Sequence, residues 1–131
     1  MVPAILSAAG TSETAIRLIA KGLLWEDANF IASALGVTLE TFADLISVPR
    51  STFFRRRGVR FAAAESEHIM RFARLWHIAL AVFPNEKAAR SWLSRPQYGL
   101  DGAIPLEYSK TELGARTVED LMMRIHYGVL A

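Results

Sequence analysis

The sequence predicts an all-α fold, and two observations support this prediction. Apolar residues recur every three or four positions along each apolar segment, which is the spacing of one helix face. No segment shows the alternating run of β-branched residues that is typical of a half-buried strand. The length of 131 residues and the 52% hydrophobic content fit one domain, or two small ones that share a core, and argue against disorder. We expect about seven helices.

The first part of the chain contains three helices with local start and stop signals. The first helix is expected at Ser12 to Lys21, with Thr11 or Ser12 as its cap and Gly22 as its end. The second is expected at Trp25 to Leu35. Gly36 ends it, and a third helix follows, capped by Thr38 and carrying Leu39, Phe42, Ala43 and Ile46 on its apolar side.

The residues from Thr38 to Arg57 have the form of a helix-turn-helix. Ala43 is small enough for a second helix to cross the first closely, and Val48 and Phe53 would fill the space between the two. Ser47 stands in the turn, where such modules usually place glycine. Pro49 suits the first position of the second helix, which is expected to reach Arg57 and to present its start to the major groove.

Basic charge is concentrated on this second helix. Five arginines and no acidic residue lie between Pro49 and Phe61, and without them the chain has 10 basic and 13 acidic residues. A local basic patch on a helix-turn-helix indicates a polyanion partner, and we expect operator DNA. The alternative is a solvated basic helix face, and for Phe54 a packed core ring. The candidate DNA-binding residues are Arg50, Ser51, Thr52, Phe54, Arg55, Arg56 and Arg57.

The second part of the chain is expected to start with its longest helix, Ala64 to Val82. Its broad apolar face suits a central or dimer-forming helix. A helix at Glu86 to Leu93 follows, capped by Asn85. The remaining expected features are a loop from Ser94 to Ser109 with a turn at Asp101-Gly102, one helical turn at Pro105, and a last helix that starts with Thr117 as its cap and ends at Gly128.

Several classes of function lack their residue patterns. Cysteine is absent, which excludes disulfides and thiolate chemistry. His68, His77 and His126 do not have the spacing of metal ligands, and no phosphate-binding glycine loop or nucleophile–base set is recognisable. No apolar run reaches the ~18 residues of a membrane helix. We expect a cytoplasmic protein that is not an enzyme and uses neither cofactor nor metal.

The end of the sequence resembles a known family. The resemblance rests on Trp92-Leu93, Pro96, Leu100, Gly102, Pro105, Gly114-Ala115-Arg116, Val118-Glu119-Asp120-Leu121 and Gly128, in that order. This pattern is similar to the toxin-binding domain of Xre, MbcA and ParS antitoxins. The helix from Pro49 to Arg57 also resembles the arginine-tipped recognition helix of Xre antitoxins, so the resemblance covers most of the chain from about Gly22 onward.

The resemblance implies an antitoxin whose partner is a RES-domain toxin, a class that looks like ADP-ribosyltransferases and consumes NAD. It also implies that residues 64–131 bind the toxin. From the helix-turn-helix and the broad apolar face of the longest helix we expect residues 1–63 to bind an inverted-repeat operator and residues 64–131 to form a homodimer or a higher toxin–antitoxin assembly. The C-terminal end would block the toxin active site; the alternative for that end is a frayed terminus. An alternative for the whole chain is a helix-turn-helix regulator without a toxin partner. The candidate toxin-binding residues are Arg124, Tyr127, Gly128, Val129, Leu130 and Ala131.

Overall fold

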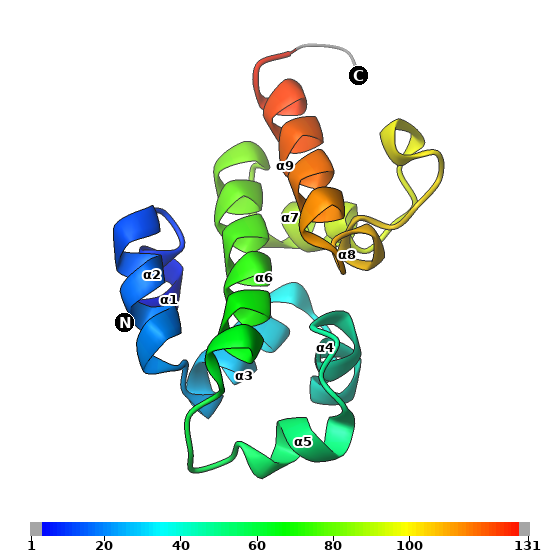
Figure 1. Ribbon diagram of the computed structural model, residues 1–131. Helices are drawn as coiled ribbons and strands as arrows, with labels where there is room; N and C mark the ends of the chain where they lie inside the picture. Colours follow the sequence, from blue (N-terminus) through cyan, green and yellow to red (C-terminus); the bar gives the residue numbers. More distant parts are fainter. Residues whose placement is uncertain (1–3, 129–131) are drawn as a thin grey trace. The chain divides into compact units, whose positions relative to one another are not determined.

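A computed structural model describes residues 4–128 and divides the chain into two compact units, residues 1–74 and 75–131. Within the described range every regular element is a helix, which confirms the all-α prediction (Figure 1). The first unit contains α1 (Ala4–Ala8), α2 (Ser12–Lys21), α3 (Trp25–Leu35), α4 (Leu39–Leu45), α5 (Arg50–Arg55) and the start of α6 (Ala63–Val82). The second contains the end of α6, α7 (Glu86–Leu93), the 3-10 turn η1 (Tyr98–Leu100), α8 (Pro105–Tyr108) and α9 (Glu112–His126).

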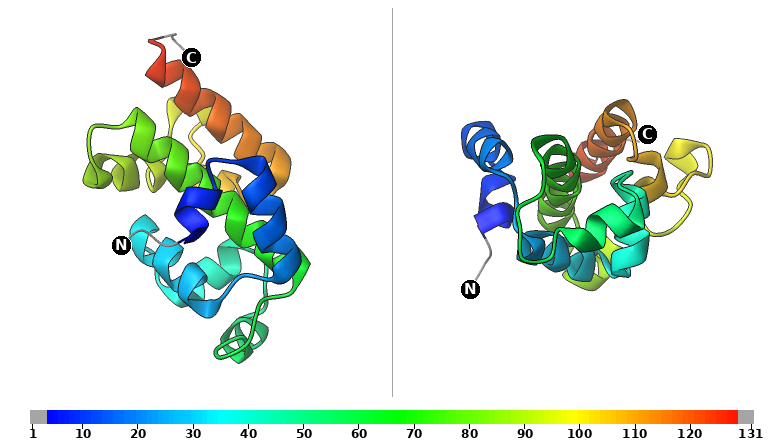
Figure 2. Two further views of the ribbon diagram at one scale, coloured as in Figure 1. Left: turned by 90° about the vertical axis from the view of Figure 1, so that its left-hand side faces the viewer. Right: turned by 60° about the horizontal axis from the view of Figure 1, so that its bottom comes forward.

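Most predicted helix ends are confirmed because they depend on local hydrogen bonds. The Thr38 hydroxyl accepts from the Thr41 amide at 3.1 Å, and the Asn85 side-chain Oδ1 accepts from the Ala88 amide at 2.8 Å. Gly36 ends α3 with a left-handed φ of 74°. Two elements were not predicted, η1 and α1. Figure 2 shows α1 lying beside α2 in the first unit.

The turn between α4 and α5 is a Schellman motif with serine at the left-handed position. The Val48 amide donates to the Ala43 carbonyl at 3.0 Å, and the Ser47 amide donates to the Asp44 carbonyl at 3.1 Å. Ser47 has a φ of 59°, which glycine adopts at much lower cost. Val48 and Phe53 are buried, as the helix-turn-helix interpretation requires, so packing around the turn compensates for the strained serine.

Two predicted helix starts and one predicted helix end are wrong. Pro49 precedes α5 as its cap residue, and α5 ends at Arg55 because the Arg56 amide bonds to Phe53 in a tighter turn. The last helix starts at Glu112, and its cap is Thr111 rather than Thr117; the Thr111 hydroxyl accepts from the Gly114 amide at 3.0 Å.

Gly114 lies in the first turn of α9, although glycine is a poor helix former. In the structure Gly114 is buried, and a β-carbon there would overlap the Tyr108 carbonyl oxygen. The glycine therefore permits a close approach between the end of α8 and the first turn of α9.

The apolar face of α6 that suggested a dimer is buried within the single chain. Ile69, Phe72, Leu75 and Ala79 have no exposed surface, and Trp76 is 2% exposed. Dimer formation stays a prediction, and this face no longer supports it.

Replacing Ser47 with glycine should stabilise the first unit. The left-handed conformation costs a non-glycine residue roughly 1–2 kcal/mol, and the entropy of glycine in the unfolded chain offsets part of the gain. We expect the free energy of unfolding to rise by about 0.5–1 kcal/mol, measured by urea denaturation. Ser33→Gly, at an exposed position inside α3, is the control and should destabilise. A loss of stability in Ser47→Gly would contradict the assignment of strain to this turn.

Candidate functional site

The basic helix α5 is held in place by one buried side chain. Phe53 is the buried residue of this six-residue helix. Its ring lies 4.9 Å from the ring of Trp25, 5.6 Å from that of Phe61 and 6.4 Å from that of Phe42, measured between centroids. These distances are typical of favourable aromatic pairs. The aromatic cluster therefore fixes α5 against α3, α4 and the segment before α6.

The loop after α5 is tied to the segment before α3. The Phe61 amide donates to the Leu23 carbonyl at 2.9 Å, and the Leu23 amide donates to the buried Ser66 hydroxyl at 2.9 Å. Arg60 donates to the Gly22 carbonyl at 2.8 Å. A β-carbon on Gly22 would lie 2.6 Å from the Phe61 carbonyl oxygen, so only glycine allows this approach. Both ends of α5 are thus anchored.

Two of the predicted DNA-binding arginines form bidentate ion pairs. Arg50 donates to Asp44 through Nε at 3.2 Å and Nη2 at 2.7 Å, on an exposed surface. This hydrogen bond raises the pKa of Arg50. Arg56 donates to Glu65 through Nε at 2.8 Å and Nη2 at 2.9 Å, and these side chains are only 29% and 15% exposed. The charges of Arg50 and Arg56 are therefore partly neutralised within the chain.

Glu65 joins α5 to the start of α6. Its Oε1 also accepts from the Ala62 amide at 2.8 Å. The hydrogen bond from Arg56 is the main cause that holds the pKa of Glu65 below its ordinary value; the Ala62 bond and the charge of Arg56 act in the same direction, while burial opposes them. This pair was not recognised in the sequence, because its partners are nine positions apart, with Arg56 directly after α5 and Glu65 in the first turn of α6.

The other predicted DNA-binding residues have different surroundings. Arg55 donates to the Thr52 hydroxyl at 3.1 Å, and Ser51 is exposed. Phe54 is half-buried, with its ring 5.6 Å from that of Trp25, so it belongs partly to the aromatic cluster. The guanidinium of Arg57 lies 5.1 Å from the Trp25 ring centroid, and within residues 4–128 no carboxylate pairs with Arg55 or Arg57.

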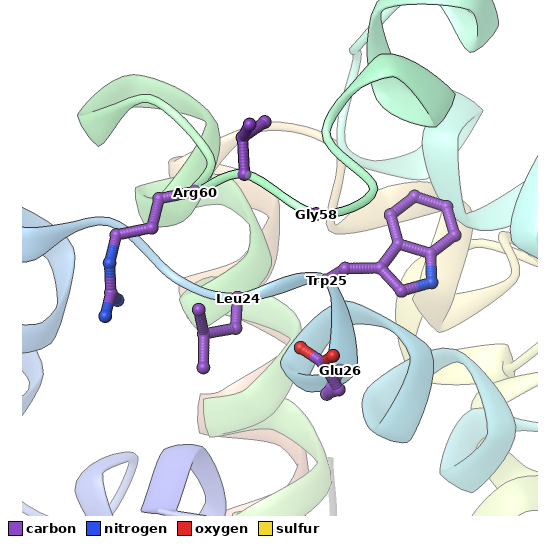
Figure 3. A pocket seen from close by; sticks show the side chains of 6 residues that line it. Leu24, Trp25, Glu26, Gly58 and Arg60 are labelled. Carbon is purple, nitrogen blue, oxygen red and sulfur yellow. The ribbon is translucent and has the colours of Figure 1, made fainter.

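A pocket of about 250 Å³ lies between the start of α3 and the loop after α5 (Figure 3). Glu26 and Arg60 give it one charge of each sign, and the Trp25 ring and Arg60 extend in opposite directions in Figure 3. Such a lining does not favour a phosphate. The lining residues are Leu24, Trp25, Glu26, Gly58, Val59 and Arg60.

Of the three histidines, His68 contacts a backbone carbonyl group. Nδ1 of His68 lies 2.8 Å from the Ile46 carbonyl oxygen, a contact that joins α6 to the end of α4. Among residues 4–128 no group of three or more histidine, aspartate or glutamate residues could hold a metal ion. No helix in the same range is long and apolar enough to cross a membrane.

In the second unit the predicted toxin-binding residues lie at the end of α9. Arg124 is exposed, Tyr127 is 72% exposed and caps the helix, and Gly128 follows with a left-handed φ of 73°, which confirms the predicted end. Val129, Leu130 and Ala131 lie outside the described residues.

Sequence reasoning missed two strongly exposed apolar residues in the second unit. Tyr98 in η1 is 95% exposed, and Leu113 in the first turn of α9 is 79% exposed. Leu113 follows Glu112 directly in the sequence and is followed by Gly114, so no helical spacing identified it.

The Arg56–Glu65 pair should make the stability of the first unit depend on pH. Because the folded-state pKa of Glu65 is lowered, the pair stabilises the fold above the ordinary glutamate pKa near 4.3, and this contribution disappears as the pH falls through the lowered value. Glu65→Gln should lower the urea midpoint at pH 7, and its difference from the wild type should shrink below about pH 4.

Glu13→Gln is the matched control, because Glu13 pairs with Arg17 on a surface where both side chains are more than 70% exposed. It should change the midpoint little at any pH. Equal effects of the two substitutions at pH 7 would show that the Arg56–Glu65 pair does not anchor α5.

Comparison with known proteins assigns each unit to a described domain. Residues 14–74 match the Antitoxin Xre-like helix-turn-helix domain, and residues 79–128 match the Antitoxin Xre/MbcA/ParS C-terminal toxin-binding domain. The chain is 38% identical to Antitoxin Xre of Yersinia enterocolitica over 87 residues, which are 64% of this chain and 59% of that protein. It is 37% identical to Antitoxin Xre of Photorhabdus laumondii over 73 residues, which are 55% of this chain and 49% of that protein.

The chain thus spans about half the length of the curated relatives that it matches. The two matched domains follow one another in the order of the two compact units and leave few residues unassigned. The chain belongs to the Xre-type family of antitoxins.

Proposed function

We propose that this protein is a cytoplasmic antitoxin that neutralises a RES-type, NAD-consuming toxin and represses its own operon. The observation that carries the proposal is the match of one chain to both a helix-turn-helix domain and a toxin-binding domain of the same family. The relatives bear the name Antitoxin Xre. A regulator without a toxin partner would have no use for the second domain.

The charge and anchoring of α5 support DNA binding by the first unit. The candidate contacts remain Arg50, Ser51, Thr52, Phe54, Arg55, Arg56 and Arg57. Arg55 and Arg57 are exposed and pair with no carboxylate in the described chain, which suits them to phosphates. Arg50 stands at the start of α5, where recognition helices contact bases. It would exchange Asp44 for a base edge or a phosphate on binding.

We place Arg56 among these contacts with a second role. Its bidentate bond to the partly buried Glu65 holds the end of α5, so replacing it would weaken DNA binding partly through the fold. Helix-turn-helix proteins commonly bind two half-sites as dimers, so we propose that a homodimer, or a larger toxin–antitoxin assembly, reads an inverted repeat.

The exposed end of α9 supports toxin binding by the second unit. Arg124 and Tyr127 project from the last turns, and the left-handed Gly128 turns the chain away from the helix axis. We propose that these residues guide Val129, Leu130 and Ala131 into the toxin active site. Occupation of that site would exclude the substrate.

Arg55→Ala should weaken binding to the DNA that lies upstream of the gene for this protein. A charged hydrogen bond is worth roughly 1.5 kcal/mol, so we expect about a tenfold loss of affinity. If Arg55 contacts a phosphate, the plot of log K against log salt should also flatten by about 0.9.

Arg17→Ala provides the control for this experiment, because it removes the same charge from the exposed surface of α2. It should change affinity little. Equal losses from the two substitutions would indicate a general charge effect and would count against α5 as the DNA-contacting element.

Deleting Val129 to Ala131 should abolish or strongly weaken protection against the toxin encoded by the adjacent gene. DNA binding should stay within about twofold of the wild type, because the described contacts of α5 all lie in residues 1–74. Protection is measured by growth during co-expression, and complex formation by co-purification. If the truncated protein protects as well as the intact one, occlusion by the C-terminal end is not the mechanism.

A further inference from the structure

We propose that Trp25 is a positioning residue for DNA binding, because its indole ring holds the guanidinium of Arg57 where Arg57 contacts a phosphate of the duplex. Trp25 stands at the start of α3, outside the helix-turn-helix segment from Thr38 to Arg57. The inference rests on the DNA binding proposed above for residues 1–74.

Trp25 lies in contact with both α5 and the residues that follow it. Its ring is 4.9 Å from the ring of Phe53 and 5.6 Å from that of Phe54, and it stacks nearly parallel to Phe61 at 6.4 Å with an angle of 8°. The guanidinium carbon of Arg57 lies 5.1 Å from the ring centroid, within the range of a cation–π interaction. One side chain of α3 therefore supports the recognition helix and also orients a cation just beyond its end.

The way in which Arg57 is held differs from that of the other arginines. Arg50 and Arg56 give two N–H donors each to a carboxylate, so those donors and much of the charge are already occupied. Arg57 instead lies over an aromatic ring, and none of its five N–H donors pairs with a carboxylate in the described chain. Arg57 is thus oriented and still able to bind a phosphate bidentately.

The location of Arg57 favours a phosphate over a base. The first residues of a recognition helix contact base edges, whereas flanking residues contact the sugar–phosphate backbone. Arg57 lies two residues after the end of α5 at Arg55. A long side chain there would lose much rotamer freedom on binding, and the cation–π contact with Trp25 removes part of that loss in advance.

A double-substitution cycle measures whether Arg57 depends on Trp25. The probe is a mixed-sequence duplex of about 20 base pairs, because non-specific binding reports phosphate contacts. Arg57→Ala should lower affinity about tenfold in the wild-type background and flatten the salt slope by about 0.9. In the Trp25→Leu background the same change should cost less than about threefold, because the oriented contact is already lost.

Arg55 is the matched control, since it lies two residues before Arg57, at the end of α5, and donates to Thr52 rather than lying over Trp25. Arg55→Ala should cost the same with and without Trp25. If both arginines lose their effect in the Trp25→Leu background, Trp25 only supports the fold of α5 and the proposal is wrong. If the effects of Trp25→Leu and Arg57→Ala are independent, the proposal is also wrong, while DNA binding stands.

A second comparison leaves Trp25 intact, so it remains decisive if Trp25→Leu does not fold. Arg57→Lys keeps the charge but loses the planar guanidinium and its bidentate fork. It should weaken binding by about threefold or more, whereas Arg55→Lys should change affinity by less than twofold. Equal effects of the two lysine variants would overturn the inference. If the wild-type protein binds neither this duplex nor the DNA upstream of its gene, the proposed DNA-binding function itself fails.

Discussion

A six-residue helix is too short to persist in water by its own hydrogen bonds, so the position of α5 depends on what holds it from outside. Phe53 supplies this anchor, with no exposed surface and four aromatic neighbours. The Arg56–Glu65 pair holds the end of the helix, and the Schellman turn at Ser47 holds its start. The arginines of the basic patch lie on this helix or shortly after it, so their positions depend on these three attachments. The positions of these basic side chains thus depend on packing as well as on the sequence.

Features that depend on neighbouring residues could be predicted from the sequence, and features that depend on distant residues could not. Thr38 and Asn85 cap helices through bonds to residues three positions later, so their residue types identify the helix starts. Gly114 lies inside α9 although glycine is a poor helix former, and only the close approach of the Tyr108 carbonyl oxygen shows why a side chain is excluded there. Ser47 shows the opposite case, in which a residue that disfavours the left-handed conformation adopts it because the turn requires it.

The same distinction between local and distant contacts applies to the candidate DNA-binding site. The concentration of arginines on one short helix is visible in the sequence, and it was sufficient to propose a polyanion partner. Which arginines are available was not visible, because Asp44, Glu65 and Trp25 come from three other helices. A count of charges therefore overestimates the electrostatic contribution: two members of the patch are already neutralised by carboxylates. Asp44, Glu65 and Trp25, which determine how each arginine is held, belong to no recognisable sequence motif.

Neutralisation of a toxin by three residues alone would be difficult to reconcile with the size of protein interfaces. A stable complex buries about 800 Å² on each partner, far more than a tripeptide can supply. If Val129 to Ala131 enter the toxin active site as proposed, the surrounding contact has to come from the second unit itself. Tyr127 and Ile125, which are 72% and 42% exposed, lie on the last turns of α9 next to that tail. A rigid helix that presents apolar side chains beside the tail would supply area and restrict the tail, so that less conformational entropy is lost on binding. On this argument truncation of the tail removes inhibition first and the complex only in part.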